Sequence, residues 1–148
     1  MHIRRWNEID NAAIAELEKI CFKYYWTQDM IADAVAMDNF IGFVLCDESG
    51  SIHGYAGAIN AGHDADIALI AVAPEFRRKG YAKRMLGELF SNLAALGVEN
   101  VYLEVRIDNI NARSLYEKSG FLPVGIRKKY YEDGSDAIVM LKEINVGK

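Results

Sequence analysis

An apolar run that ends at a proline and leads into a basic, glycine-containing turn constrains this chain more than any other feature. The run covers residues 67–72, the proline is Pro74, and the turn covers residues 77–80, after which an amphipathic helical pattern begins. Free backbone N–H groups at the start of a helix point at a bound anion, and the helix dipole favours negative charge there. A strand that leads through such a turn into a helix therefore predicts a site for a phosphorylated ligand.

Length, composition and charge bound the class of protein. The 148 residues are 51% apolar and 26% charged, which fits one domain with a sizeable core. The net charge of −4 argues against direct nucleic-acid binding, which needs a basic face, and we interpret the basic triplet at residues 127–129 as solvated surface. No apolar stretch approaches the ~20 residues that cross a bilayer, and the first residues lack a signal-peptide pattern. We expect a cytoplasmic protein without a membrane partner.

The cysteines and histidines indicate no metal site. Cys21 and Cys46 lie in apolar stretches without metal-ligand spacing, so we expect reduced, buried thiols, with a single disulfide as the alternative. His2, His53 and His63 have no ligand spacing either. We therefore expect that the protein binds no metal ion.

Apolar periodicity and turn residues predict the order of helices and strands. Expected helices cover residues 10–24 and 27–37, capped by Asp10 and Thr27; a third carries the apolar stripe 85–93 and ends near Gly97, and a fourth covers 109–119. Expected strands cover residues 3–6, 40–46, 52–60, 67–72, 98–105, 121–130 and 137–141, and strand 67–72 should be buried on both faces. Antiparallel strands precede a strand–helix–strand–helix unit, so the fold class is α+β, a mixed sheet with helices on both faces.

A carboxylate falls within a strand that should run through the middle of the sheet. In the strand at residues 98–105, alternation places Glu104 and Arg106 on the face opposite Leu103. A strand between two helices should have both faces covered, where a carboxylate is costly unless it is paired or opens into a cleft. Glu104 is therefore either an ion-pair partner of Arg106 or of a lysine, or a general base where the sheet opens.

The helix that follows carries two further candidates. Asn109 lies at the helix start, where an amide caps the helix or meets a ligand, and capping is the commoner role. Tyr116 lies seven residues on, two helical turns along the same face. Core packing is the usual role of a helical tyrosine, and a ligand-facing hydroxyl is the alternative that the shared face offers.

These motifs resemble the GNAT superfamily of acetyl-CoA-dependent N-acetyltransferases. Residues 77–82 fit its pyrophosphate signature, (Arg/Gln)-x-x-Gly-x-(Gly/Ala). From residue 70 to residue 140 the chain also looks like the RimI group of protein N-terminal acetyltransferases, whose namesake acetylates a ribosomal protein at an N-terminal alanine. This closer similarity rests above all on Leu-Glu-Val-Arg at residues 103–106, the spaced Asn109, and Leu-Tyr-Glu at residues 115–117.

The resemblance implies a role for each motif. Glu104 would be the general base, and Tyr116 the general acid beside the leaving sulfur. The residues implied to hold acetyl-CoA are Ile70, Ala71, Val72, Arg77, Arg78, Lys79, Gly80, Tyr81, Ala82, Lys83 and Asn109, with one backbone N–H of residues 70–72 serving as an oxyanion donor. The residues implied to line the acceptor groove are Tyr24, Tyr25, Trp26, Tyr130 and Tyr131.

The family also implies an architecture and a reaction. It implies one domain over residues 1–148, with a mostly antiparallel sheet of about seven strands splayed at the cofactor cleft. The reaction would be direct transfer of acetyl from acetyl-CoA to the N-terminal amine of a protein, a ribosomal protein being one candidate, by a monomer or weak homodimer.

Two departures from the group leave the substrate's first residue open. Leu69 stands where many members have a polar Asn or Thr, and Tyr-Tyr-Trp-Thr at residues 24–27 replaces a Phe-Pro-Trp-Ser-like segment. Two other functions therefore stay open: a GNAT enzyme acting on a small amine or on lysine, and an acetyl-CoA-binding regulatory module without turnover.

Overall fold

The computed structural model describes residues 1–144, which form a seven-stranded sheet. Its strands are β1 His2–Arg5, β2 Phe40–Cys46, β3 Ile52–Ala61, β4 Asp64–Val72, β5 Asn100–Arg106, β6 Leu122–Arg127 and β7 Ala137–Glu143. Their order across the sheet is β1-β2-β3-β4-β5-β7-β6, and every neighbouring pair is antiparallel except β4 and β5. The predicted α+β fold, with a mostly antiparallel sheet of seven strands, is confirmed.

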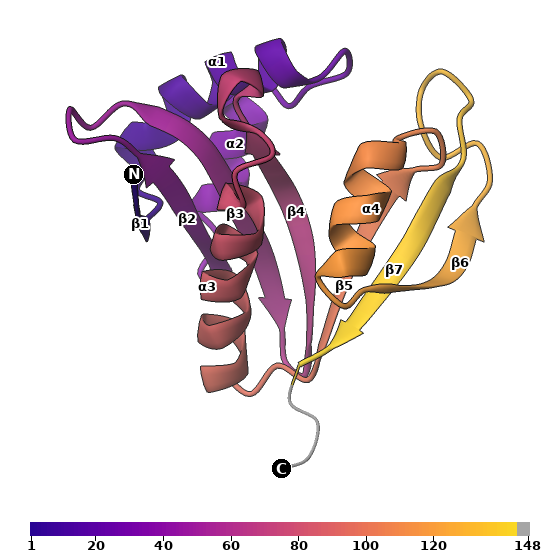
Figure 1. The fold of residues 1–148 in the computed structure, drawn as a ribbon. Helices are drawn as coiled ribbons and strands as arrows, with labels where there is room; N and C mark the ends of the chain where they lie inside the picture. Colours follow the sequence, from indigo (N-terminus) through magenta and orange to yellow (C-terminus); the bar gives the residue numbers. More distant parts are fainter. Residues whose placement is uncertain (145–148) are drawn as a thin grey trace.

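Helices cover both faces of this sheet. They are α1 Asn11–Cys21, α2 Gln28–Val35, α3 Tyr81–Ala95 and α4 Ile110–Lys118, with short 3-10 turns η1 Glu8–Asp10 and η2 Pro74–Phe76. In Figure 1, α3 and α4 lie on the near face, and α1 and α2 lie on the other. Each face has its own apolar core, because α3 and α4 pack in one buried cluster while α1 and α2 pack in a second.

The predicted apolar stripe of α3 fixes how that helix packs. Met85, Leu86, Leu89 and Leu93 are fully buried against β2, β3 and β4, and Phe90 is half-buried. Such spacing places one face of a helix on a core. The helix ends at Ala95, and Gly97 follows with a φ of 90°, a left-handed conformation that glycine adopts without strain.

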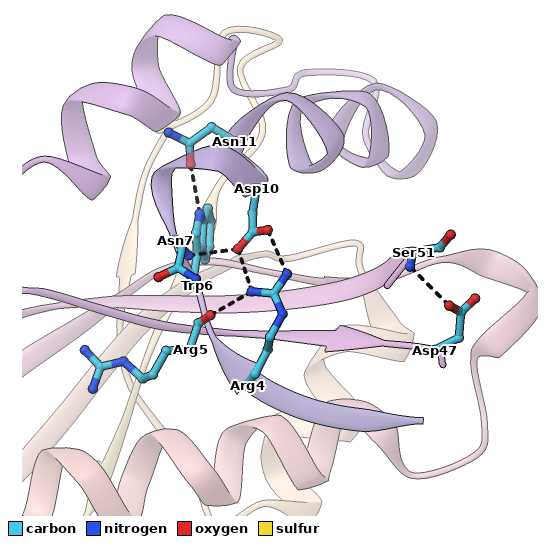
Figure 2. Close-up of polar contacts among 8 residues, drawn as sticks. All are labelled: Arg4, Arg5, Trp6, Asn7, Asp10, Asn11, Asp47 and Ser51. Carbon is cyan, nitrogen blue, oxygen red and sulfur yellow. Dashed lines mark hydrogen bonds and ion pairs between the residues drawn. The ribbon is translucent and has the colours of Figure 1, made fainter. Parts of the chain in front are cut away.

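The N-terminal segment is held by a buried ion pair and not by the predicted helix cap. Asp10 is 4% exposed and accepts hydrogen bonds from both terminal nitrogens of Arg4, at 2.8 and 2.9 Å, and from the backbone N–H of Asn7, at 2.8 Å (Figure 2). The expectation that Asp10 caps α1 through its side chain is wrong, because the carboxylate is engaged by β1 instead. Trp6 adds a second link between β1 and α1 by donating to Asn11 Oδ1 at 2.9 Å (Figure 2).

A buried carboxylate on α1 holds the loop between α1 and α2. Glu18 is 3% exposed; its Oε2 accepts from the Tyr55 hydroxyl of β3, and its Oε1 accepts from the backbone N–H of Trp26 at 2.9 Å. The helix predicted to reach residue 24 therefore ends at Cys21, with Phe22 extended (φ −132°, ψ 140°). Thr27 then caps α2 as predicted, because its hydroxyl accepts from the N–H of Met30 at 3.2 Å.

Both cysteines are free thiols, as predicted, but only one is buried. Cys46 is fully buried in β2, whereas Cys21 is half-buried at the end of α1, with Sγ 3.8 Å from the Val72 carbonyl oxygen. Within residues 1–144, no helix has the length and apolar character that a membrane span requires. No group of three or more His, Cys, Asp or Glu side chains in this range is arranged to hold a metal ion.

Replacing Asp10 by asparagine should test the ion pair of the N-terminal segment. We expect the Asp10→Asn variant to lose about 1.5–3 kcal/mol of unfolding free energy at pH 7, the usual value of hydrogen bonds to a charged group. The Arg4 guanidinium lowers the pKa of Asp10, so this contribution is complete above the ordinary carboxyl pKa of about 4 and is lost as the pH falls through the folded pKa. Urea unfolding from pH 7 to pH 3 should therefore show the two proteins converging. Asp33→Asn, at an exposed position of α2, is the matched control, and an equal loss there would contradict the assignment.

Candidate active site

The two parallel strands at the centre of the sheet pair over only three residues and then separate. Residues 64–66 of β4 pair with residues 100–102 of β5, and beyond them β4 pairs only with β3 while β5 pairs only with β7. In Figure 1 the two strands diverge toward the top of the view. Alternate backbone groups of a strand point to opposite edges, so half of those in residues 67–72 face this opening.

This separation overturns the prediction that residues 67–72 are buried on both faces. Leu69 and Val72 are buried, but Ile67, Ile70 and Ala71 are only half-buried. The register also shifts between Gly57 and Ala58 of β3, which leaves residue 68 of β4 without a partner in the ladder. A bulge of this kind bends a strand and increases its twist. The bulge therefore lies next to the point where β4 stops pairing with β5.

The turn after β4 presents backbone donors to solvent. Arg78 and Gly80 have φ values of 64° and 82°, and α3 begins at Tyr81 without a side-chain cap. Its first intrahelical bond runs from Arg84 N–H to the Gly80 carbonyl at 3.1 Å, so the N–H groups of residues 81–83 precede the helical ladder. A Cβ built on Gly80 meets no atom within 4 Å, so the space above the turn is open. Consecutive N–H groups in such a turn form an anion-binding concavity.

The side chains of this turn divide into supporting and exposed groups. Arg77 Nε donates to the Val72 carbonyl at 2.9 Å, so Arg77 braces the end of β4. Lys79 Nζ lies 5.7 Å from the centre of the Phe76 ring. The half-buried Tyr81 and Ala82 pack against the core under α3, whereas Arg78 and Lys83 are exposed. Arg77 and Lys79 are exposed as well, so within residues 1–144 Arg78 and Lys83 differ from them in having no such contact with the end of β4 or with Phe76.

Glu104 lies on the open face of β5, two residues past the end of the β4 pairing. Val101, Leu103 and Val105 are buried, whereas Glu104 is half-buried with 27% of its side chain exposed, so the expectation that both faces of this strand are covered is wrong. Within residues 1–144, no helix covers the Glu104 face in this half of the sheet, because α4 packs with the buried face (Figure 1).

The carboxylate of Glu104 has a loose partner. Its Oε2 lies 3.5 Å from Arg127 Nε, and that oxygen is buried without a hydrogen-bond partner among residues 1–144. Among the described residues, neither Arg106 nor a lysine pairs with it, so the ion-pair interpretation named the wrong partner. Interaction with Glu104, first by hydrogen bonding, raises the pKa of Tyr130, and burial followed by the charge of Glu104 raises the pKa of Asp66. Glu104 therefore acts on the pKa of both Tyr130 and Asp66, and Arg127 opposes its effect on each of them.

Arg106 joins the two loops that flank this face. Its guanidinium carbon lies 4.3 Å from the centre of the Tyr131 ring and 5.2 Å from that of Tyr24, and its Nη1 donates to both carboxylate oxygens of Asp133 at 3.0 and 3.1 Å. The Ser135 N–H and then Arg106 hold the pKa of Asp133 at about 2. We call Tyr24, Arg106, Tyr131 and Asp133 the Arg106 cluster.

The structure brings together some, but not all, of the predicted acceptor-side aromatics. Tyr130 packs edge-on against Tyr131, with ring centres 5.1 Å apart, beside Glu104. Tyr24 joins them through Arg106, and Tyr25 is 43% exposed on the same loop. Trp26 instead packs against the core under α1 and α2, because its backbone N–H is tied to Glu18.

The two α4 candidates have partly structural roles. Asn109 Oδ1 accepts from the N–H of Ala112 at 3.2 Å and caps the helix, which leaves the amide nitrogen as the group able to meet a ligand. Tyr116 is 8% exposed and packs edge-on against Phe121, with ring centres 5.9 Å apart. Burial, and then proximity to Tyr131, raise the pKa of Tyr116 above its ordinary value.

Sequence reasoning missed three residues that shape this site. Arg127 was expected in a solvated triplet, although its position in the last hairpin places it beside Glu104. Arg106 shares a strand face with Glu104, which was recognised, but its contacts with two distant loops have no local signal. Glu18 had a readable signal, because it is a charge on the apolar stripe formed by residues 14, 17 and 21.

Comparison with known proteins agrees with the fold and with this arrangement. Residues 11–121 match the model of the acetyltransferase (GNAT) family. Over 140 residues the chain is 31% identical to the ribosomal protein bS18-alanine N-acetyltransferase of Escherichia coli, covering 93% of each chain. It is 38% identical over 106 residues to the N-alpha-acetyltransferase RimI of Mycobacterium tuberculosis, covering 68% of this chain and 65% of that one.

A solved structure shows the same likeness in three dimensions. The crystal structure of the ribosomal-protein-S18-alanine N-acetyltransferase of Escherichia coli matches with a TM-score of 0.91 and 29% identity, over 99% of this chain and 96% of that one. The family match is consistent with two features of the structure, the separation of β4 from β5 and the open turn before α3. The chain is therefore an N-acetyltransferase that belongs to the GNAT family.

Proposed function

We propose that this enzyme transfers the acetyl group of acetyl-CoA to the N-terminal α-amine of a protein, with a ribosomal protein as the first candidate acceptor. The observation that carries the proposal is the near full-length similarity to ribosomal-protein-alanine N-acetyltransferases, in sequence and in fold. The chemistry of the Glu104 face supports it independently, because a carboxylate there lies beside the aromatic side chains of two loops.

The cofactor side of the opening fits acetyl-CoA. The N–H groups at the start of α3 would hold the pyrophosphate, with Arg78 and Lys83 as nearby exposed cations. Beyond residue 66, the edge of β4 that no longer pairs with β5 offers backbone donors to the pantetheine arm and to the acetyl carbonyl. One of these donors would stabilise the oxyanion that develops on the acetyl carbonyl. Within residues 70–72, the N–H groups that face the opening, and not those that face β3, are the groups assigned this role.

The acceptor must lose a proton before it attacks, and this favours an α-amine. An α-amine has a pKa of about 7.7–8.0 and lysine one of about 10.4, so deprotonation at pH 7 costs about 1 kcal/mol for the first and about 4–5 kcal/mol for the second. A half-exposed carboxylate such as Glu104, acting through a water molecule, suffices for the smaller cost. The amine then attacks the thioester carbonyl, the attacking nitrogen gives up a proton to solvent, and the C–S bond breaks to leave the amide and release CoA as the thiolate.

Tyr116 serves the departing sulfur as a hydrogen-bond donor. A thiol has a pKa of about 8.5 and tyrosine one of about 10, so full proton transfer is already uphill by about 2 kcal/mol. Burial raises the pKa of Tyr116 further and makes transfer less favourable still. A buried, neutral phenol nevertheless stabilises a thiolate by donating a hydrogen bond, and its edge-on contact with Phe121 fixes its orientation.

A panel of short peptides should test the proposed reaction directly. The peptides differ only in the first residue, and the first of the series is initiated by alanine. Each is paired with an Nα-blocked version that contains lysine. We expect acetyl-CoA-dependent release of CoA only with free N-termini. Turnover on blocked peptides would move the acceptor to lysine. If no peptide leads to release of CoA while acetyl-CoA still raises the melting temperature, the result would favour a small amine as the acceptor, or a regulatory module without turnover.

Replacing Glu104 by glutamine should lower turnover without weakening acetyl-CoA binding. We expect kcat to fall by about 100-fold, at the lower end of general-base contributions, because deprotonating an α-amine at pH 7 costs only about 1 kcal/mol. The defect should shrink as the pH rises above about 8, where the amine loses its proton unaided. Steady-state kinetics from pH 6 to pH 9 measure both effects. Glu88→Gln, on the exposed face of α3, is the matched control, and an unchanged kcat in Glu104→Gln would refute the assignment.

Replacing Tyr116 by phenylalanine should have a milder effect on the same rate constant. The ring packing is kept and one hydrogen bond to a charged sulfur is lost, which is worth about 1.5 kcal/mol or about tenfold in kcat. The melting temperature and the KM for acetyl-CoA should stay within error of the wild type. If kcat of Tyr116→Phe is unchanged, the hydrogen bond to the leaving sulfur is refuted and Tyr116 serves only in packing.

A further inference from the structure

The open face of β5 carries one acceptor and one donor that residues 1–144 do not satisfy. Glu104 Oε2 and Arg106 Nη2 are both buried atoms without a hydrogen-bond partner in this part of the chain. Each group has an ionic partner, since Arg127 Nε lies 3.5 Å from Oε2 and Asp133 binds Nη1 of Arg106, but neither contact supplies a hydrogen bond to these two atoms. Leaving a buried charged group without a hydrogen bond is costly, so such atoms call for an explanation. Here the two lie on the same strand, two residues apart.

Their spacing follows from strand geometry. Residues i and i+2 of a strand point to the same face and lie about 6.6 Å apart along it. The guanidinium is fixed in this position by Asp133, on Nη1, and by the rings of Tyr131 and Tyr24 on its two flanking loops. The position of Nη2 is therefore set independently of any partner it binds, as a recognition group requires.

An acceptor followed by a donor is the complement of the first residue of a peptide. Its amine supplies the hydrogen-bond donor, and its carbonyl, one Cα away, supplies the acceptor. We propose that Arg106 is a specificity-determining residue, whose Nη2 donates to the first carbonyl of the acceptor peptide while Glu104 receives the amine. This inference rests on the proposed function and adds the group that distinguishes an N-terminus from other amines.

Side-chain and small amines lack this second group. The ε-amine of lysine is separated from its nearest carbonyl by the whole aliphatic side chain, and a simple alkylamine has none. Either would leave Arg106 Nη2 unpaired, and a site built to pair a polar group rejects ligands that lack it. Because Nη2 is buried, the proposed contact requires a neighbouring ring to move aside. The ring of Tyr24 is the candidate, since its centre lies 5.2 Å from the guanidinium carbon and it is 43% exposed on the loop between α1 and α2, at the top of Figure 1.

A double cycle between enzyme and substrate tests the proposed contact. The substrates are an alanine-initiated peptide and the same peptide with its first carbonyl replaced by an (E)-alkene isostere; the enzymes are the wild type and Arg106→Met. We expect each single change to raise the peptide KM by about tenfold, and the isostere to cost less than twofold in Arg106→Met. The KM for acetyl-CoA should stay within twofold throughout. If the two changes instead raise the peptide KM independently, so that their factors multiply when both are present, the proposed contact is overturned.

Further variants separate recognition from support of the loop. Asp133→Asn removes the ion pair to the loop between β6 and β7 but keeps Nη2, so the penalty for the isostere should persist there. Arg106→Lys keeps a cation beside the rings and should recover part of the peptide affinity. Arg5→Met, which removes a guanidinium 5.6 Å from the Phe43 ring at the opposite edge of the sheet, should leave every constant unchanged.

The outcomes distinguish this inference from the function on which it rests. If the wild type fails to acetylate the unmodified peptide, the proposed function is overturned and the inference falls with it. If the wild type acetylates that peptide but Asp133→Asn abolishes the penalty for the isostere as Arg106→Met does, Arg106 only supports the loop, and the inference alone is overturned.

Discussion

The short parallel pairing between β4 and β5 is the constraint on which the rest of this structure depends. Three residues of each strand hold the two halves of the sheet together, and beyond them each strand pairs with its outer neighbour only. A sheet that stayed closed would satisfy the backbone of residues 67–72 and cover Glu104. Because it opens, backbone donors of β4 and a carboxylate of β5 face the same space, which is what acetyl transfer between two substrates needs.

The loops above the opening are held by two charged side chains, one buried and one half-buried. Glu18 links the loop between α1 and α2 to β3, and Arg106 links the same loop to the one between β6 and β7. Burial raises the pKa of Glu18, because two hydrogen bonds only partly replace the water that the carboxylate loses. Removing one partner of such a group costs more than the bond itself contributes. These side chains therefore fix loops whose own sequences carry few conformational constraints.

Local patterns predicted the elements whose packing is local. The stripe of α3, the cap at Thr27 and the turn at residues 77–80 were readable because helix periodicity, capping and glycine at positive φ are short-range effects. Asp10 was misjudged because its partner Arg4 lies on a strand outside the helix signal. The exposure of β4 was missed because an apolar run does not reveal where its neighbour departs. The contacts of Arg106 and Arg127 depend on loops brought together only by the tertiary fold.

On one side of the opening the proposed binding groups belong to the backbone, and on the other side they belong to side chains. This difference separates the binding of the cofactor from the choice of acceptor. In the proposed function, the cofactor side relies on backbone N–H groups of β4 and of the start of α3, which every non-proline side chain leaves in place. The acceptor side relies on side chains of β5 and of two loops, where each substitution changes a contact. Leu69 is buried in the core under α1 and α2, away from that set of side chains. Differences in acceptor preference between this chain and its relatives should therefore be sought in the loop at residues 22–27 and around the Arg106 cluster, and not in the phosphate-binding turn.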